Sequence, residues 1–186
     1  MALKSTIYKA NLSIADIDHS YYEDHQLTLA RHPSETDERM MIRLLALAIN
    51  AYKLQAVCKG DGKLAFGAGL SDPDDPDCSL RDFTGQTRMW IEVGQPEDKP
   101  IMKACQKADE VLLYCFNHAA EVWWKGIETK LTRLDKLQVW RVPTERSQEL
   151  AKLAERSMQL QATVQEGSVT FSSDKGSVHI ELIRWK

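Results

Sequence analysis

The N-terminal segment alternates between apolar and polar positions, the pattern of a half-buried β-strand. One side carries Thr6, Tyr8, Ala10, Leu12 and Ile14, and the other side carries Lys9, Asn11 and Ser13. A polar break follows at residues 16–20, and the alternation returns at residues 26–31. We therefore predict a long antiparallel hairpin between residues 6 and 31.

The period then changes in "HPSETDERMMIRLLALAINAY", residues 32–52. Its apolar residues recur at helical spacing. Ser34 can cap the helix, because acidic residues that favour a helix N-terminus follow it directly. We predict a helix from Glu35 to Leu54.

The middle of the chain alternates between strand and helix patterns. The segments "LAFGAG", "CSLRDF" and "TRMWIEVG" predict three strands, and a tight turn at Thr84-Gly85 joins the last two. Pro100 suits the first turn of a helix, and "EVLLYCF" is a continuous apolar run typical of a buried strand. The order helix, strand, strand, strand, helix, strand predicts an α/β fold with a mixed β-sheet flanked by helices.

Towards the C-terminus we predict a helix in "HAAEVWWKGIETKLTRLD", a strand in "LQVWRV" and a helix in "TERSQELAKLAERS". Three strands follow, with turns at Glu166-Gly167 and Lys175-Gly176. These strands and the N-terminal hairpin either extend the central sheet or form a small sheet of their own. We expect one domain that spans residues 1–186.

The composition is that of a soluble globular protein, with 43% hydrophobic residues, 27% charged residues and a formal net charge of −3. The chain has no net positive charge that would attract nucleic acid at long range, so a polyanion would need a local patch of basic residues. The sequence contains neither a signal peptide nor a membrane-spanning stretch, so we expect a cytoplasmic protein, bacterial or eukaryotic, without membrane association. The wide spacing of the four cysteines predicts neither a zinc site nor a disulfide framework.

Glu92 is the first candidate for chemistry, because a carboxylate rarely lies in an apolar strand such as "WIEVG" without a partner or a task. Asp82 ends the preceding predicted strand. Two carboxylates that converge from a hairpin suit Mg²⁺ or Mn²⁺, with water completing the coordination. Such an ion can activate water and polarise a phosphate. In the structural alternative, Asp82 caps the Thr84-Gly85 turn and Glu92 pairs with a basic side chain across the sheet.

The hairpin register offers a second partner for Glu92. If Thr84-Gly85 is a two-residue loop, facing residues are equidistant from it, which places Asp77 opposite Glu92. Asp82 then lies roughly 16 Å from Glu92 along the strand. A bulge or a longer loop would bring Asp82 closer. Asp82 is therefore the primary candidate ligand, and Asp77 is the alternate one.

Three segments resemble a known family. "HPSETDERMMIRLLA", "RDFTGQTRMWIEVGQP" and "KPIMKACQKADEVLLYCF" are similar to the YaeQ family of small bacterial proteins, and the resemblance runs nearly end to end. It implies a fold similar to the PD-(D/E)XK nuclease-like superfamily. That fold has a restriction-endonuclease-like core of helix, three strands, helix and strand, with the N-terminal hairpin and the C-terminal strands added. The cellular function of the family is poorly defined.

The resemblance also implies site residues. Asp82 and Glu92 match the acidic metal ligands of the superfamily motif, and the carbonyl of Val93 would be a further ligand. Gly94 stands where the motif has a lysine that positions the attacking water and stabilises charge. The other implied positions are Lys103 and Gln95 for catalysis, and Glu38, Arg39, Arg43 and Lys107 for binding.

Arg39 and Arg43 have two interpretations. They are four residues apart on the first helix, so they either contact a phosphate together or pair with Glu35 or Glu38.

Two functions follow as hypotheses. The first is a Mg²⁺- or Mn²⁺-dependent phosphodiesterase, a nuclease with a variant active site. The second is a non-catalytic module that keeps the fold and binds a nucleic acid or a protein. The retained acidic residues favour the first hypothesis, whereas Gly94 and the acidic net charge favour the second.

Overall fold

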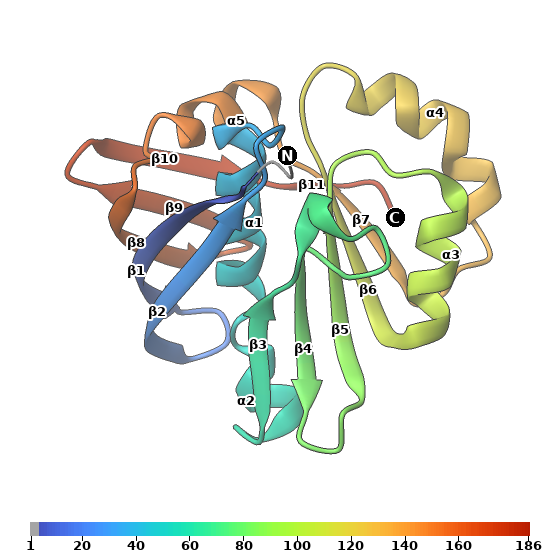
Figure 1. Cartoon of the computed structure of the whole chain (residues 1–186), viewed down its shortest axis with the longest axis horizontal. Coiled ribbons are helices and arrows are strands. Elements are labelled where there is room, and N and C mark those ends of the chain that lie inside the picture. Colours follow the sequence, from blue (N-terminus) through green and yellow to red (C-terminus); the bar gives the residue numbers. More distant parts are fainter. Residues whose placement is uncertain (1–3) are drawn as a thin grey trace. The chain divides into compact units, whose positions relative to one another are not determined.

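The computed structural model describes residues 4–186, and its contacts gather in two compact units (Figure 1). Unit 1 comprises Met1–Tyr52 and Glu145–Leu182, and unit 2 comprises Lys53–Thr144 and Ile183–Lys186. Each unit contains its own β-sheet. Neither unit is continuous in sequence, because the chain leaves unit 1 after the first helix and returns to it near residue 145.

Unit 1 is built on a five-stranded sheet in the order β10-β9-β8-β1-β2. Its elements are β1 (Thr6–Asp16), β2 (Tyr21–Arg31), α1 (Asp37–Asn50), all but the first residue of α5 (Thr144–Ala151), β8 (Ser157–Gln165), β9 (Ser168–Ser173) and β10 (Gly176–Glu181). The predicted N-terminal hairpin is confirmed, with Thr6 opposite Arg31 and Asp16 opposite Tyr21. β1 also pairs in parallel with β8. The terminal strands therefore form a sheet of their own.

Apolar and polar residues alternate along the strands of this sheet, so one face is apolar and the other is polar. On β1 the side chains of Tyr8, Ala10, Leu12 and Ile14 are buried, and β8 repeats the pattern with Met158, Leu160, Ala162 and Val164. α1 lies against this apolar face (Figure 1). The opposite face carries the polar residues of each strand.

The first helix is shorter than predicted. α1 begins at Asp37 because the side chain of Thr36, in extended conformation, accepts a hydrogen bond from the Arg39 N–H at 3.1 Å. Ser34 is not the cap; its hydroxyl lies 2.6 Å from the His32 ring. The predicted helix Glu35–Leu54 is interrupted after Asn50, and a separate short helix follows in unit 2.

Unit 2 contains a six-stranded sheet in the order β11-β7-β6-β5-β4-β3. Its elements are α2 (Lys53–Cys58), β3 (Gly62–Phe66), the 3₁₀ turn η1 (Gly69–Ser71), β4 (Cys78–Asp82), β5 (Thr87–Val93), α3 (Asp98–Lys107), β6 (Ala108–Cys115), α4 (Ala120–Leu131), β7 (Leu137–Arg141) and β11 (Ile183–Arg184). β3, β4 and β5 pair antiparallel, whereas β5, β6 and β7 pair in parallel. This confirms the predicted mixed sheet flanked by helices, and the sheet of unit 1 is a second mixed one.

A cluster of apolar side chains fixes α3 and α4 on one face of this sheet (Figure 1). It includes Trp90 of β5, Val111 and Leu113 of β6, Ile101 and Ala104 of α3, and Ile127 and Leu131 of α4. All four cysteines are buried free thiols. Within residues 4–186, no helix is long and apolar enough to cross a membrane.

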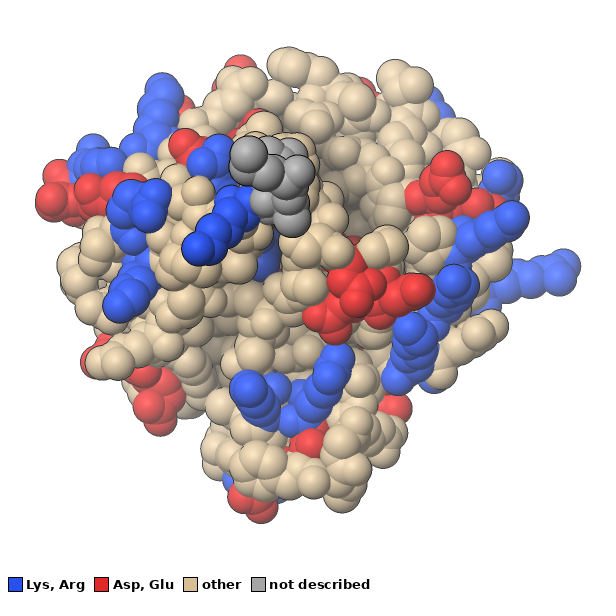
Figure 2. Space-filling model, in the orientation of Figure 1, with Lys and Arg blue, Asp and Glu red and all other residues tan. Residues whose placement is uncertain are grey.

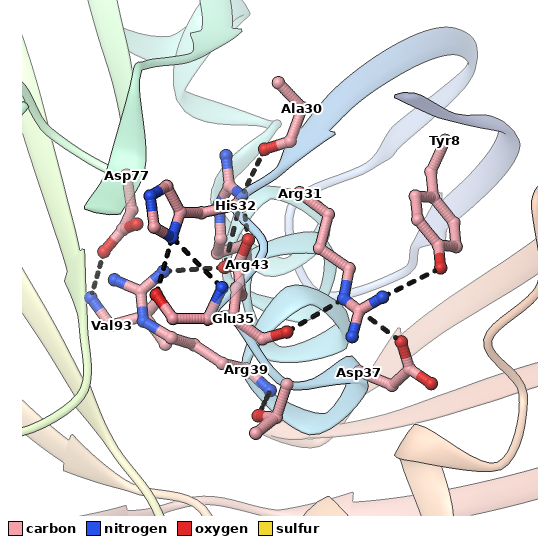
Figure 3. A network of polar contacts seen from close by, with 12 residues as sticks. Tyr8, Ala30, Arg31, His32, Glu35, Asp37, Arg39, Arg43, Asp77 and Val93 are labelled. Carbon is pink, nitrogen blue, oxygen red and sulfur yellow. Dashed lines mark hydrogen bonds and ion pairs between the residues drawn. The ribbon is translucent and has the colours of Figure 1, made fainter. Parts of the chain in front are cut away.

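A buried charge network ties the start of α1 to the end of β2 (Figure 3). Glu35 accepts hydrogen bonds from Arg39 at 2.7 Å and from Arg43 at 3.1 Å, and Arg43 also donates to the carbonyl of Ala30. Arg31 donates to the backbone carbonyl of Glu35 at 2.9 Å. The side chains of Glu35 and Arg43 are each only 1% exposed, so each charge depends on its partners.

We predict that Glu35→Ala lowers the free energy of unfolding by about 3–5 kcal/mol, because it removes one partner of a buried ion pair. The matched control is Asp37→Ala, whose carboxylate pairs with Arg31 but is 50% exposed. This control should cost about 1 kcal/mol or less. Urea unfolding measures both, and equal losses in the two variants would contradict this account of the network.

Candidate functional site

The end of the β4–β5 hairpin brings Asp77 to Glu92. Cys78 pairs with Ile91, so Asp77, the preceding residue, faces Glu92. The Asp77 N–H donates to the carbonyl of Ile91 at 3.0 Å, and the Val93 N–H donates to the Asp77 carboxylate at 2.8 Å (Figure 3). The predicted two-residue loop at residues 84–85 is wrong, because Arg81 pairs with Thr87 and the Asp82 N–H donates to the carbonyl of Gln86. The bulge after Leu80 restores the deduced register at the open end of the hairpin, so the alternate ligand faces Glu92.

Asp82 lies at the other end of the same hairpin. Its Oδ1 accepts from the Thr84 N–H, the Thr84 hydroxyl and the Gln86 N–H, and its Oδ2 accepts from Arg88 at 2.8 Å. The register does shift, between residues 80 and 81. This bulge does not bring Asp82 to Glu92, so Asp82 has the turn-capping position of the structural alternative.

These hydrogen bonds determine the ionisation of Asp82. The Thr84 hydroxyl, followed by the Gln86 N–H and Arg88, lowers the pKa of Asp82 to about 2. Arg88 also binds Asp109, and that hydrogen bond is the main cause that raises the pKa of Arg88. Because both Asp82 oxygens already accept from protein donors, this carboxylate fits a metal ion poorly.

Glu92 is held by a residue of its own strand. The indole N–H of Trp90 donates to Glu92 Oε1 at 2.7 Å, and the two side chains share one face because they are two positions apart on β5. The ammonium of Lys107 lies 5.5 Å from the centre of the Trp90 ring, within the range of a cation–π contact. The sequence predictions name Glu92 but not Trp90, although a spacing of two residues on a predicted strand indicates a shared face.

Gly94 has a backbone reason to be glycine. Its φ is +118°, a conformation that residues with a side chain rarely adopt, and its N–H donates to the Tyr114 carbonyl at 2.9 Å. A Cβ at this position would meet no atom within 4 Å. Space alone would therefore admit the motif's lysine, whereas the backbone conformation at the end of β5 opposes it.

The other proposed catalytic residues have different partners. Gln95 donates to the carbonyl of Phe116. Lys103 lies on the exposed face of α3, with its ammonium 3.6 Å from the Asp74 carboxylate. No contact between either side chain and Glu92 is found within the part of the chain that the structure describes. Their catalytic roles stay predictions.

Three lysines form a row along α3. Lys99, Lys103 and Lys107 are four residues apart and exposed, so they follow one face of the helix. We call them the lysine row. Lys107 also donates to the backbone carbonyl of Asp74, at 3.4 Å.

An acidic loop lies beside the lysine row. It contains Asp72, Asp74 and Asp75, between η1 and β4. Asp75 accepts from the Ala68 N–H and pairs with Arg81. Figure 2 shows red side chains over the connection from β3 to β4 and blue side chains next to them, over α3. The local charge is thus mixed.

The candidates on α1 belong to unit 1 and have partners there. Glu38 accepts from the Ser147 hydroxyl at 2.5 Å. Arg39 and Arg43 both bind Glu35, as the ion-pair interpretation predicts. No sequence signal indicated Ser147, because it is 109 positions from Glu38.

The donor set for a metal ion is small. Within residues 4–186 there is no group of three or more His, Cys, Asp or Glu side chains placed to hold an ion. Asp77 and Glu92 supply two carboxylates at most, and Asp77 is 1% exposed. Magnesium accepts two protein carboxylates when water and substrate phosphate complete its octahedron. Asp77 and Glu92 thus supply only the minimum number of carboxylate ligands for Mg²⁺, and Asp82 supplies no further ligand.

We predict that Asp82→Asn removes a pH-dependent part of the stability. The folded pKa of Asp82 is about 2 against an ordinary value of 3.8, so its contribution is complete above about pH 4 and is lost as the pH falls towards 2. Urea midpoints of the native chain should therefore fall more steeply over this window than those of Asp82→Asn. Thr84→Val, which removes the main cause of the shift, should give an intermediate slope. Parallel curves for native and Asp82→Asn would contradict this assignment.

The sequence and fold match one family over nearly the whole chain. The family model described as "YaeQ protein" matches residues 1–182. The protein named "Uncharacterized protein YaeQ" from Escherichia coli (strain K12) is 42% identical over 187 aligned residues, covering 100% of this chain and 98% of that protein. The protein of the same name from Salmonella typhi is 41% identical, with the same coverage.

Two solved structures share the fold. The YaeQ protein from Xanthomonas axonopodis pv. citri has a TM-score of 0.88 and 38% identity, with 98% of each chain covered. The YaeQ protein from Pseudomonas syringae also has a TM-score of 0.88, with 33% identity, and the comparison covers 98% of this chain and 96% of that one. The chain therefore belongs to the YaeQ family.

Proposed function

We propose that the chain binds the phosphate backbone of a nucleic acid at the lysine row and does not cleave it. The observation that carries this proposal is the geometry of α3. Its three exposed lysines follow one face with a separation of about 6 Å per four residues. Evenly spaced ammonium groups are suited to successive phosphates.

The present partners of the lysine row are weak competitors for a phosphate. The Lys103–Asp74 pair spans 3.6 Å, and both side chains are 65% exposed. Such surface pairs contribute about 0–1 kcal/mol. A phosphate oxygen can therefore replace Asp74 as the partner of Lys103 at small cost.

The lack of cleavage follows from the end of β5. Phosphodiester cleavage needs a group that stabilises the charge developing in the transition state. Gly94 supplies no side chain, Gln95 is bound to a backbone carbonyl, and Lys103 faces Asp74. Since the net charge of the chain is −3, binding depends on the local row and should be sensitive to salt.

We predict that Lys103→Gln/Lys107→Gln weakens binding of single- or double-stranded DNA, or RNA, by roughly an order of magnitude. The slope of log K against log salt should fall by about 2, because two phosphate contacts are lost. Lys125→Gln/Lys130→Gln on α4 makes the same charge change on exposed positions and should bind like the native chain. Fluorescence anisotropy at several salt concentrations measures both variants. Equal affinities of the two double variants would contradict the proposal. The absence of binding to any of these nucleic acids would also contradict it and would favour a protein partner.

A second candidate function is a Mg²⁺- or Mn²⁺-dependent phosphodiesterase, favoured by the placement of Asp77 opposite Glu92 at the ends of two strands. These two carboxylates, with the carbonyl of Val93, would hold the ion. Bound there, it would supply an activated water and polarise a phosphate oxygen. Trp90 would orient Glu92 through its indole N–H.

For this second function, calorimetry with Mn²⁺ should show binding that Glu92→Gln weakens at least about tenfold, because a charged ligand is replaced by a neutral one. Asp82→Asn is the matched control and should bind Mn²⁺ as the native chain does, since its oxygens serve the turn. Equal affinity in all three proteins would exclude Glu92 as a ligand.

A further inference from the structure

The sheet of unit 1 carries a groove on the face opposite α1. Its volume is about 620 Å³, which is in the usual range for small-molecule sites. Its lining comes from β1, β2, β8, the end of β9 and the β9–β10 turn, namely Asn11, Leu12, Ser13, Asp24, His25, Gln26, Gln159, Leu160, Gln161, Ser172, Ser173 and Asp174. None of these residues takes part in the site of unit 2.

The strand register arranges the polar side chains of the groove in two rows. The first row is Gln26, Asn11 and Gln159, and the second row is Asp24, Ser13, Gln161 and Ser172. Within the first row, Asn11 donates to the Gln159 side-chain carbonyl at 3.2 Å. Facing residues on neighbouring strands are about 5 Å apart, so each row is a closely spaced series of hydrogen-bonding groups.

The chemistry of the lining excludes several ligand classes. No Lys or Arg is among the described lining residues, and the two carboxylates, Asp24 and Asp174, would repel a phosphate. The side chains of Leu12 and Leu160 are buried in the core, and no large exposed hydrophobic side chain is among the described lining residues, so the apolar surface of the groove comes from carbon atoms spread among its polar groups. The two carboxylates come from opposite sides of the groove, since β2 and the β9–β10 turn are separated by β1 and β8. Two separated carboxylates are too few to bind a basic peptide.

We propose that this groove binds a neutral polyhydroxylated ligand, an oligosaccharide. Every sugar hydroxyl both donates and accepts a hydrogen bond. The four side-chain amides and the serine hydroxyls of the groove offer both roles, while the two carboxylates accept from hydroxyl groups. Amides at neighbouring strands can reach adjacent hydroxyls of one ring.

An exposed aromatic ring stands next to these rows. Tyr22 faces Ala15, two positions along the strands from the row of Asp24 and Ser13, or about 7 Å. Its side chain is 60% exposed, although a large hydrophobic residue gains by burial. The face of a sugar ring would cover it while the hydroxyls meet the amides.

The test is a titration of the ¹⁵N-labelled full chain with cellotriose, maltotriose and chitotriose, followed by amide chemical shifts. At least one of these sugars should shift the resonances of β1 and β8 at residues 11–13 and 159–161, with saturable binding. Asn11→Ala and Gln161→Ala should each weaken this binding at least about fivefold, because each removes a hydrogen-bonding amide. Gln165→Ala, an exposed amide on the same face of β8 beyond the groove, should leave it unchanged.

Because these side chains are exposed, their substitution should leave the fold intact. The amide resonances outside the groove check this, since they should match those of the native chain. The proposal is overturned if none of the three sugars shifts the groove residues, or if the shifts persist unchanged in both Asn11→Ala and Gln161→Ala. It is also overturned if hexalysine or a single-stranded oligonucleotide occupies the groove and the sugars do not.

Discussion

The antiparallel register between β4 and β5 is the constraint on which the candidate site depends. With Cys78 opposite Ile91, Asp77 lies at the open end of the hairpin beside Glu92, and Asp82 lies at the turn. A carboxylate at a turn accepts hydrogen bonds from the N–H groups that the turn leaves unpaired, which is what Asp82 does. One register thus determines which acidic residue is available to Glu92.

The conformation of Gly94 is the second constraint on the end of β5. A positive φ at the end of β5 favours glycine, so a lysine side chain is disfavoured two residues after Glu92. Exposed lysines lie instead along α3, and the proposed function gives them the role of binding a phosphate. The groove of unit 1 has a different lining, in which neutral amides and hydroxyls outnumber charged side chains.

Local rules in the sequence predicted much of the fold and part of the site. The alternation of β1 is a short-range signal, so the first hairpin could be deduced. The deduced β4–β5 register is present at Cys78 and Ile91 only because the bulge after Leu80 compensates for a loop longer than two residues. The parallel pairing of β1 with β8 and the addition of β11 to β7 depend on contacts between distant segments. Likewise, the conformation of Gly94 and the partner of Lys103 depend on tertiary structure, which no spacing of residue types encodes.

The most direct test of the central claim is cleavage of a supercoiled plasmid by the purified native chain in Mn²⁺, quantified beside Glu92→Gln. The account predicts that the plasmid is retarded by binding and stays supercoiled, with the same background of nicked product for both proteins. Nicked or linear product that accumulates with the native chain and is absent with Glu92→Gln would contradict it, because Glu92 would then be a catalytic ligand despite glycine at position 94.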